Sequence, residues 1–171
     1  GGREGLTMAQ RFPADFDGIF SRVPVINWVA LQAAGTRVGA AQFGAGWISP
    51  EKVKLVHDAV LAVCDERDGI ADGIVSDYEG CRRVFDLTRL RCPSGTDAGK
   101  NCLSDAQLRA VQTMYSPFAF NFPLVNGVRA YPGWGLGGEN ASGGGPVGGW
   151  MSWQTGTAAP TGWDYTGGSP E

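Results

Sequence analysis

The sequence lacks any run of lysine or arginine, and its 14 Lys+Arg against 17 Asp+Glu leave a formal charge of −3. Proteins that bind nucleic acid or an anionic membrane surface present a basic face. No apolar stretch reaches the ~18 residues that a membrane-spanning helix requires, and the polar, glycine-rich first residues are not typical of a signal peptide. We therefore expect neither a nucleic-acid partner nor a membrane partner.

The sequence also lacks an initial methionine, and Met8 falls within a helical pattern instead of at a start. We therefore expect a piece of a longer protein. An apolar fraction of 43% is enough to form a buried core, and a chain of this length suits one domain or part of a larger one. The 27 glycines are concentrated in the last third of the sequence, which predicts loops there.

The four cysteines form two pairs of near neighbours, Cys64 with Cys81 and Cys92 with Cys102. Their even number and short separations favour local disulfides, although three pairings are compatible with the sequence. Zinc is the alternative, but no two cysteines have the C-x₂₋₄-C spacing of a structural zinc site. Disulfides are the preferred interpretation, and they imply an oxidising compartment, either secreted or periplasmic.

Two helix starts are well marked. Ser49 precedes Pro50 in the pattern of a serine cap followed by a proline in the first turn, and apolar residues then recur at helical spacing up to Cys64 (Val53, Val56, Val60 and Val63). Ser104 and Gln107 form a capping-box pattern, which predicts a helix that ends near Pro117.

The other segments give weaker signals. Residues 2–12 are expected to form a helix, and residues 15–23 are expected to form a short buried strand. Residues 27–43 are compatible with a helix, but Gly35 and Gly39 predict breaks in it. After residue 117 the chain shows no sustained period.

The most informative stretch lies between residues 65 and 79, where six acidic residues accompany one basic residue, Arg67. Carboxylate oxygens beside glycines, which let carbonyl groups turn inward, suit the 6–8 oxygen ligands of Ca²⁺. The spacing is not that of an EF-hand. A solvated acidic turn explains the same residues, so the two interpretations stay open on this evidence.

The remaining chemically active residues carry weaker signals. His57, the single histidine, has no marked catalytic partner and is expected to be a helix-packed, partly buried imidazole. The aromatic residues of the last third either pin irregular loops or line a pocket for an aromatic ligand. Asn140-Ala141-Ser142 fits the glycan-acceptor pattern.

Several motifs together resemble the tannase and feruloyl esterase family of α/β-hydrolases, which includes enzymes that cleave mono(2-hydroxyethyl) terephthalate. In that family a G-C-S-x-G-G-R nucleophile elbow opens a helix, so the chain would start just after the serine. The matching segments are Gly1-Gly2-Arg3-Glu4-Gly5, Gln10 to Ile19, Val23-Pro24, Ile48-Ser49-Pro50, Cys64-Asp65, Asp68 to Val75, Cys81, Arg91-Cys92, Cys102-Leu103-Ser104 and Gly149-Trp150-Met151-Ser152-Trp153.

The resemblance implies an α+β, mostly irregular fold with several helices. Residues 1–26 would be the segment of the α/β-hydrolase core that follows the elbow, and residues 27–171 would be a lid domain with a glycine- and aromatic-rich tail. The catalytic serine, aspartate and histidine would all lie outside the chain, and His57 does not match the catalytic histidine.

The same resemblance implies two kinds of site. A structural Ca²⁺ would be bound by three carboxylates and two backbone carbonyls (Asp65, Asp68 and Asp72, with Ile70 and Ile74). Trp153 and Trp150 would contact the substrate.

The implied function is that of a secreted serine carboxylic-ester hydrolase acting on esters of aromatic acids. The chain would contribute its lid, would be inactive by itself, and would have the remainder of the α/β-hydrolase chain as its partner. The alternative is a calcium-stabilised extracellular binding module that uses exposed tryptophans.

Overall fold

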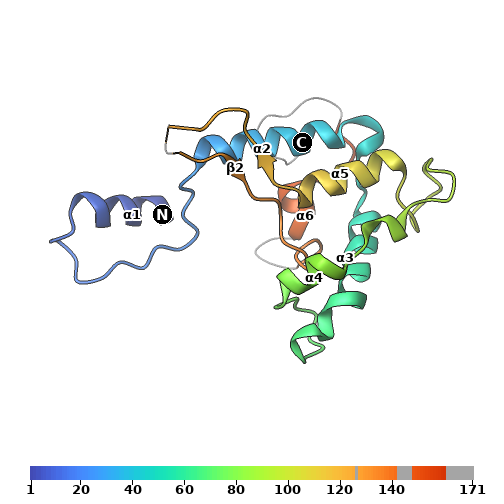
Figure 1. The fold of residues 1–171 in the computed structure, drawn as a ribbon, viewed down its shortest axis with the longest axis horizontal. Coiled ribbons are helices and arrows are strands. Elements are labelled where there is room, and N and C mark those ends of the chain that lie inside the picture. The colour runs from blue at the N-terminus through green and yellow to red at the C-terminus, as the bar shows by residue number, and fades with distance from the viewer. Residues whose placement is uncertain (126, 142–147, 161–171) are drawn as a thin grey trace.

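The computed structural model (Figure 1) describes residues 1–125, 127–141 and 148–160, and it is rich in helices. The helices are α1 (Gly2–Arg11), α2 (Trp28–Gln42), α3 (Pro50–Cys64), α4 (Tyr78–Val84), α5 (Asp105–Tyr115) and α6 (Gly149–Trp153), with 3₁₀ turns η1 (Gly44–Gly46), η2 (Asp65–Asp68) and η3 (Leu87–Leu90). Strands β1 (Phe118–Ala119) and β2 (Ala130–Tyr131) pair antiparallel, with Phe118 opposite Tyr131. The expected α+β, mostly irregular fold class is confirmed. Among the helices in these ranges, none has the length and apolar character needed to cross a bilayer.

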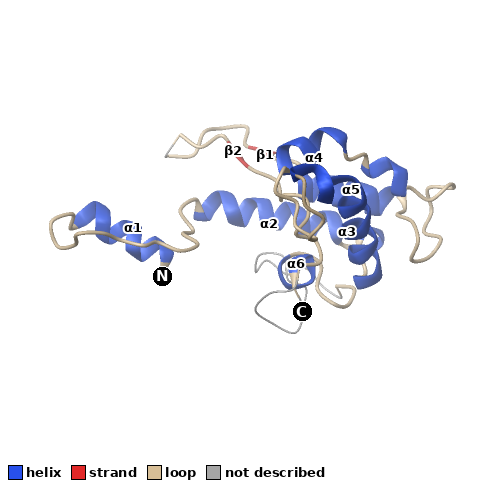
Figure 2. Cartoon of the chain, turned by 90° about the horizontal axis from the view of Figure 1, so that it is seen from below, coloured by secondary structure: helices blue, strands red, loops and turns tan. Residues whose placement is uncertain are grey.

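The body of the molecule forms around one core between α2, α3 and α5, and α1 with the loop after it lies to one side of that body (Figures 1 and 2). Ile48, Val53, Leu103 and Val111 are fully buried in this core. By contrast, α1 buries none of its residues. The first 26 residues therefore contribute little to the core of this structure.

The expected helix at the N-terminus is confirmed as α1, but the strand expected at residues 15–23 is wrong. That segment turns back along α1, where the Ser21 hydroxyl donates to the Gly2 carbonyl and a Cβ on Gly2 would clash with the Arg22 carbonyl. Phe20 is 91% exposed. A strand requires a neighbour to pair its backbone N–H and C=O groups, and the segment has no such neighbour in the part of the chain that the structure describes.

The breaks expected within residues 27–43 are also wrong, because α2 continues through Gly35 and Gly39 without interruption. Each glycine costs a helix about 1 kcal/mol relative to alanine. The helix buries Ala30, Val38 and Gln42, and α2 packs against α5. Burial of this face offsets the low helix propensity of the two glycines.

The helices that begin near residues 50 and 105 are confirmed, with one correction. The capping box of α5 is complete, since the Ser104 hydroxyl accepts from the Gln107 N–H and the Gln107 side chain accepts from the Ser104 N–H. Ser49 does not cap α3 with its side chain, because its hydroxyl donates to Glu51 Oε2 at 2.8 Å. The apolar stripe of α3 is buried at its first three valines, whereas Val63 is 41% exposed.

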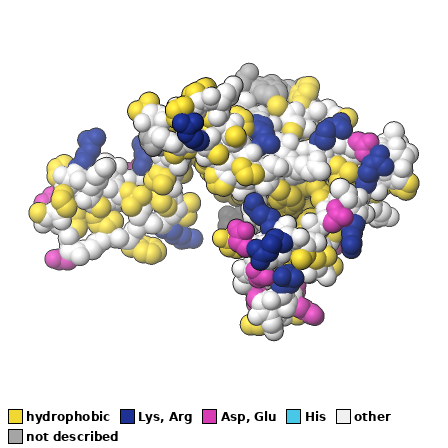
Figure 3. Space-filling model, in the orientation of Figure 1, with side chains coloured by type: hydrophobic (Ala, Val, Ile, Leu, Met, Phe, Trp, Pro, Cys, Tyr) yellow, Lys and Arg dark blue, Asp and Glu magenta, His cyan; other side chains and the backbone are white. Residues whose placement is uncertain are grey.

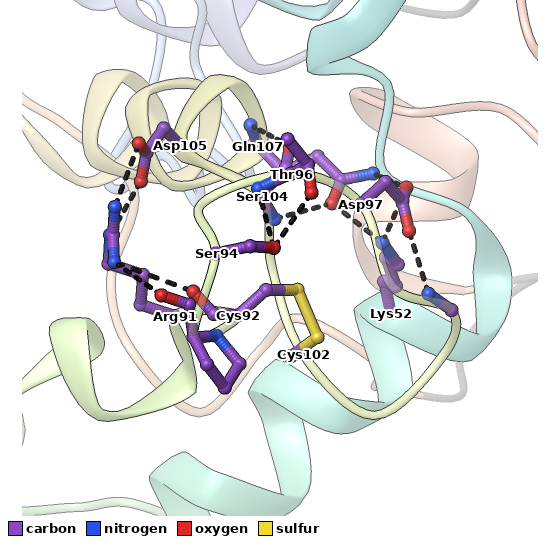
Figure 4. The surroundings of a disulfide bond; sticks show 12 residues. Lys52, Arg91, Cys92, Ser94, Thr96, Asp97, Cys102, Ser104, Asp105 and Gln107 are labelled. Atoms are coloured by element: carbon purple, nitrogen blue, oxygen red, sulfur yellow. Dashed lines mark hydrogen bonds and ion pairs between the residues drawn. A yellow bond between two sulfur atoms is a disulfide. The ribbon is translucent and has the colours of Figure 1, made fainter.

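Both disulfides pair as expected, Cys64 with Cys81 and Cys92 with Cys102. The second closes a loop that buried polar groups attach to α3 and α5 (Figure 4). Lys52 Nζ donates to Asp97 Oδ2 at 2.8 Å and to Gln107 Oε1 at 2.6 Å. The bond from Lys52 lowers the pKa of Asp97. The Lys52 side chain is 5% exposed and that of Asp97 is 52% exposed, so the pair joins the surface loop to the body at the edge of the core.

The elements of the last third lack a strong sequence signal and were not expected individually. They are the β1–β2 hairpin and α6, and α4 was also missed earlier in the chain. Asp77 caps α4 by accepting from the Gly80 N–H at 2.9 Å. Ser142 of the glycan-acceptor pattern lies outside the described residues, as do Trp163 and Tyr165.

Candidate functional site

The two tryptophans of α6 have opposite environments. Trp150 is 1% exposed and contacts the ring of Tyr115, with centroids 5.3 Å apart and an interplanar angle of 56°. Trp153 is 63% exposed. In this structure Trp150 is a core residue, and Trp153 is the exposed member of the pair.

A buried carboxylate lies directly beneath the start of α6. Glu139 is 0% exposed. The Tyr115 hydroxyl donates to its Oε1 at 2.6 Å, and the Gly137 N–H donates to both of its oxygens at 3.0 and 3.1 Å. Its backbone carbonyl accepts from the Trp150 N–H at 2.8 Å. Glu139 therefore joins α5, its own loop and α6.

His57 of α3 completes this cluster. Its Nδ1 lies 3.2 Å from Glu139 Oε2, and its side chain is 14% exposed, so the expected packed imidazole is confirmed. The two atoms share one hydrogen bond, whose donor depends on the tautomer of the imidazole. Burial and the neighbouring carboxylate raise the pKa of Tyr115 well above its usual value, so its hydroxyl stays a donor. Sequence reasoning missed Glu139 as the partner of His57.

Buried polar groups hold the other end of α6. The side-chain amide of Gln42 donates to the Gln154 carbonyl at 2.8 Å, and Trp47 Nε1 donates to the Thr155 carbonyl at 3.0 Å. Gln42, Gln154 and Thr155 are each at most 4% exposed. Both ends of this short helix are thus fixed to distant parts of the chain.

The acidic loop folds around its own aspartates. Asp65 Oδ1 accepts from the Gly73 N–H at 2.9 Å, and Asp68 accepts from the Ile70 N–H at 3.0 Å and the Ser76 N–H at 3.2 Å. These bonds, the one from Ile70 first, lower the pKa of Asp68. Asp72 Oδ1 accepts from the Ile74 N–H at 3.0 Å, and Ile70 and Ile74 are 62% and 60% exposed.

The chemistry of these donors suits Ca²⁺, because three hard carboxylates and accessible carbonyls occupy one loop. Their side chains are not gathered at a single point, since no group of three His, Cys, Asp or Glu residues in the described part of the chain is arranged to hold a metal ion. The disulfide between Cys64 and Cys81 ties the two ends of the loop together. The proposed ligands thus share a braced loop, and calcium binding here remains a prediction.

Apolar side chains are exposed over the N-terminal segment (Figure 3), whereas charges of both signs cover the lobe formed by the end of α3, η2 and α4. We call these apolar residues the N-terminal apolar surface: Leu6, Met8, Phe12, Phe16, Ile19, Phe20, Val23, Ile26, Trp28 and Val29, each at least 36% exposed. A pocket of about 370 Å³ lies beside it, between the start of α1 and Trp28. Large apolar residues exposed in such number are unusual on the surface of a soluble protein.

Comparisons with known proteins agree on one family. The sequence profile of tannase and feruloyl esterase matches residues 1–167. The chain is 36% identical over 141 residues to an uncharacterized esterase of Agrobacterium fabrum, covering 78% of this chain and 26% of that protein. It is 35% identical over 135 residues to a probable feruloyl esterase B-2 of Aspergillus fumigatus, covering 77% of this chain and 24% of that protein.

A solved structure gives the same result. The crystal structure of feruloyl esterase B from Aspergillus oryzae matches with a TM-score of 0.72 and 26% identity, covering 93% of this chain and 30% of that one. The chain spans about a quarter of the length of the curated relatives that it matches.

Proposed function

The chain belongs to the tannase and feruloyl esterase family, and on that premise we propose that it is the lid-bearing part of a secreted serine esterase acting on esters of aromatic acids. The observation that carries the proposal is the exposed Trp153 on a helix fixed at both ends. An exposed indole on a rigid support offers a flat apolar face to an aromatic acyl group.

We infer that residues 1–26 belong to the α/β-hydrolase core and residues 27–171 to the lid. Two features support this division: α1 buries none of its residues, and eight of the ten residues of the N-terminal apolar surface lie within residues 1–26. The remainder of the hydrolase chain is the natural cover for that surface. In the complete enzyme a serine upstream of Gly1 would attack the ester, with a histidine and an aspartate from outside this chain.

Replacing Trp153 with alanine in the full-length protein is expected to reduce kcat/KM for para-nitrophenyl ferulate about tenfold relative to para-nitrophenyl acetate. Loss of one apolar contact to an acyl group is worth about that much in specificity. The two esters share a leaving group, so their ratio reports the acyl group alone.

Trp134→Ala is the matched control, because Trp134 is also exposed, at 40%, but lies outside α6. That variant should keep the wild-type ratio. An unchanged ratio in Trp153→Ala would mean that Trp153 does not contact the substrate. A full-length protein that hydrolyses neither ester would refute the esterase proposal itself.

We also propose that Ca²⁺ binds the loop of Asp65, Asp68 and Asp72 through their carboxylates, together with the carbonyls of Ile70 and Ile74. At free calcium about a hundredfold above Kd, a single site adds about 2.7 kcal/mol to the free energy of unfolding. A chelator should therefore lower the midpoint of thermal unfolding by several degrees.

Two charge-matched variants test the ligand assignment. Asp68→Asn should abolish the difference between melts with calcium and with chelator, whereas Glu66→Gln, which removes one charge from the same loop, should preserve it. If the wild-type melts with calcium and with chelator superimpose, the calcium proposal is wrong.

A further inference from the structure

We propose that Glu139 is a positioning residue for substrate selection, because its buried carboxylate holds the loop on which α6 rests and so fixes the direction of Trp153. The inference rests on the proposed function, in which Trp153 contacts the aromatic acyl group. Glu139 itself touches no substrate, since it is 0% exposed.

The first step of the argument is the cost of placing this charge in the interior. Burying a carboxylate costs several kcal/mol unless it is paired and hydrogen-bonded. Glu139 receives donors from three directions, namely Tyr115 of α5, His57 of α3 and Gly137 of its own loop. An apolar side chain of the same volume would avoid that cost, but it could not accept from these donors. The carboxylate keeps its three partners only while α3, α5 and the loop stay in one arrangement.

The second step is the direct contact between this residue and α6. The Glu139 carbonyl accepts from the Trp150 N–H at 2.8 Å. A Cβ added to Gly149, whose φ is +55°, would lie 2.2 Å from that carbonyl oxygen. The first turn of α6 therefore lies against the backbone of Glu139 with no room between them.

The third step is the dependence of α6 on its anchors. A helix of five residues is too short to be stable by itself. Its direction is set by Glu139 at one end and by Gln42 and Trp47 at the other. A displacement of its first turn moves Trp153, and misplacement of a substrate contact by about 1 Å can cost about a hundredfold in rate.

Three variants of the full-length protein test the positioning role of Glu139, each assayed on the two para-nitrophenyl esters. Glu139→Ala should reduce the ferulate-to-acetate ratio of kcat/KM about tenfold, as Trp153→Ala does. The double variant should lose no more than Trp153→Ala alone, because both changes act through the same contact between Trp153 and the substrate. Glu139→Gln should recover part of the ratio, since its amide oxygen still accepts from Tyr115 and Gly137.

The ratio separates positioning from loss of folded protein, because both esters are hydrolysed by the same active molecules. Leu87→Ala provides the control, since it truncates a buried side chain of η3, outside the contacts that hold α6, and should leave the ratio unchanged. Equal losses on both esters in Glu139→Ala, or additive losses in the double variant, would overturn the proposal while leaving the esterase function intact. A normal ratio in Trp153→Ala would overturn it as well, and absence of all hydrolysis by the wild-type protein would overturn both.

Discussion

The 171-residue chain, purified by itself, is expected to hydrolyse para-nitrophenyl ferulate no faster than a buffer blank. Ester hydrolysis by this mechanism requires a nucleophile beside a base and preorganised donors for the oxyanion. In our proposal the serine lies two residues before Gly1. In the full-length protein, replacing that serine with alanine should therefore lower kcat about 10⁴-fold or more.

His57 provides the decisive comparison, because its contact with Glu139 is geometrically similar to the base and acid of a catalytic triad. In the full-length protein His57→Ala should lower kcat less than tenfold, since the imidazole is a packing residue in our proposal. If the isolated chain hydrolyses the ester and His57→Ala abolishes that activity, the active site contains His57 and Glu139. The lid interpretation would then be wrong.

Replacing Trp150 with alanine in the full-length protein should lower the free energy of unfolding by about 3–5 kcal/mol. Truncation of a fully buried large aromatic residue loses its transfer free energy and leaves a cavity. Trp150 is 1% exposed and contacts Tyr115. The urea midpoint followed by circular dichroism gives the measurement.

Trp153→Ala is the matched control, since it makes the same substitution three residues later on the same helix. Trp153 is 63% exposed, and a surface substitution of this kind changes stability by about 0.5 kcal/mol or less. Equal shifts in the two variants would mean that Trp153 is covered in the complete protein, contrary to its proposed contact with substrate.

The parts of the fold that could be predicted are those encoded by neighbouring residues. The capping box of Ser104 and Gln107 and both disulfides were predicted correctly, because each depends on a short spacing. The continuous α2 could not be predicted, since its glycines are tolerated only through burial against α5. The segment at residues 15–23 has the apolar pattern of a strand but no partner strand in the described chain.

The candidate site was partly predictable for the same reason. The family resemblance indicated Trp153, and the concentration of acidic residues drew attention to the loop at residues 65–79; the roles of both stay predictions. Nothing in the sequence indicated Glu139, an acidic residue in a glycine-rich stretch, because its partners Tyr115 and His57 lie far away along the chain. Long-range polar pairing of this kind has no local pattern.

The order of the disulfides along the chain has a consequence for biosynthesis. Each cysteine is bonded to the next unpaired cysteine in sequence, and the two closed loops do not overlap. In the secreted enzyme that we propose, Cys81 would reach Cys64 before Cys92 has entered the oxidising compartment. Among these four cysteines, the native pairs are thus the first that can form.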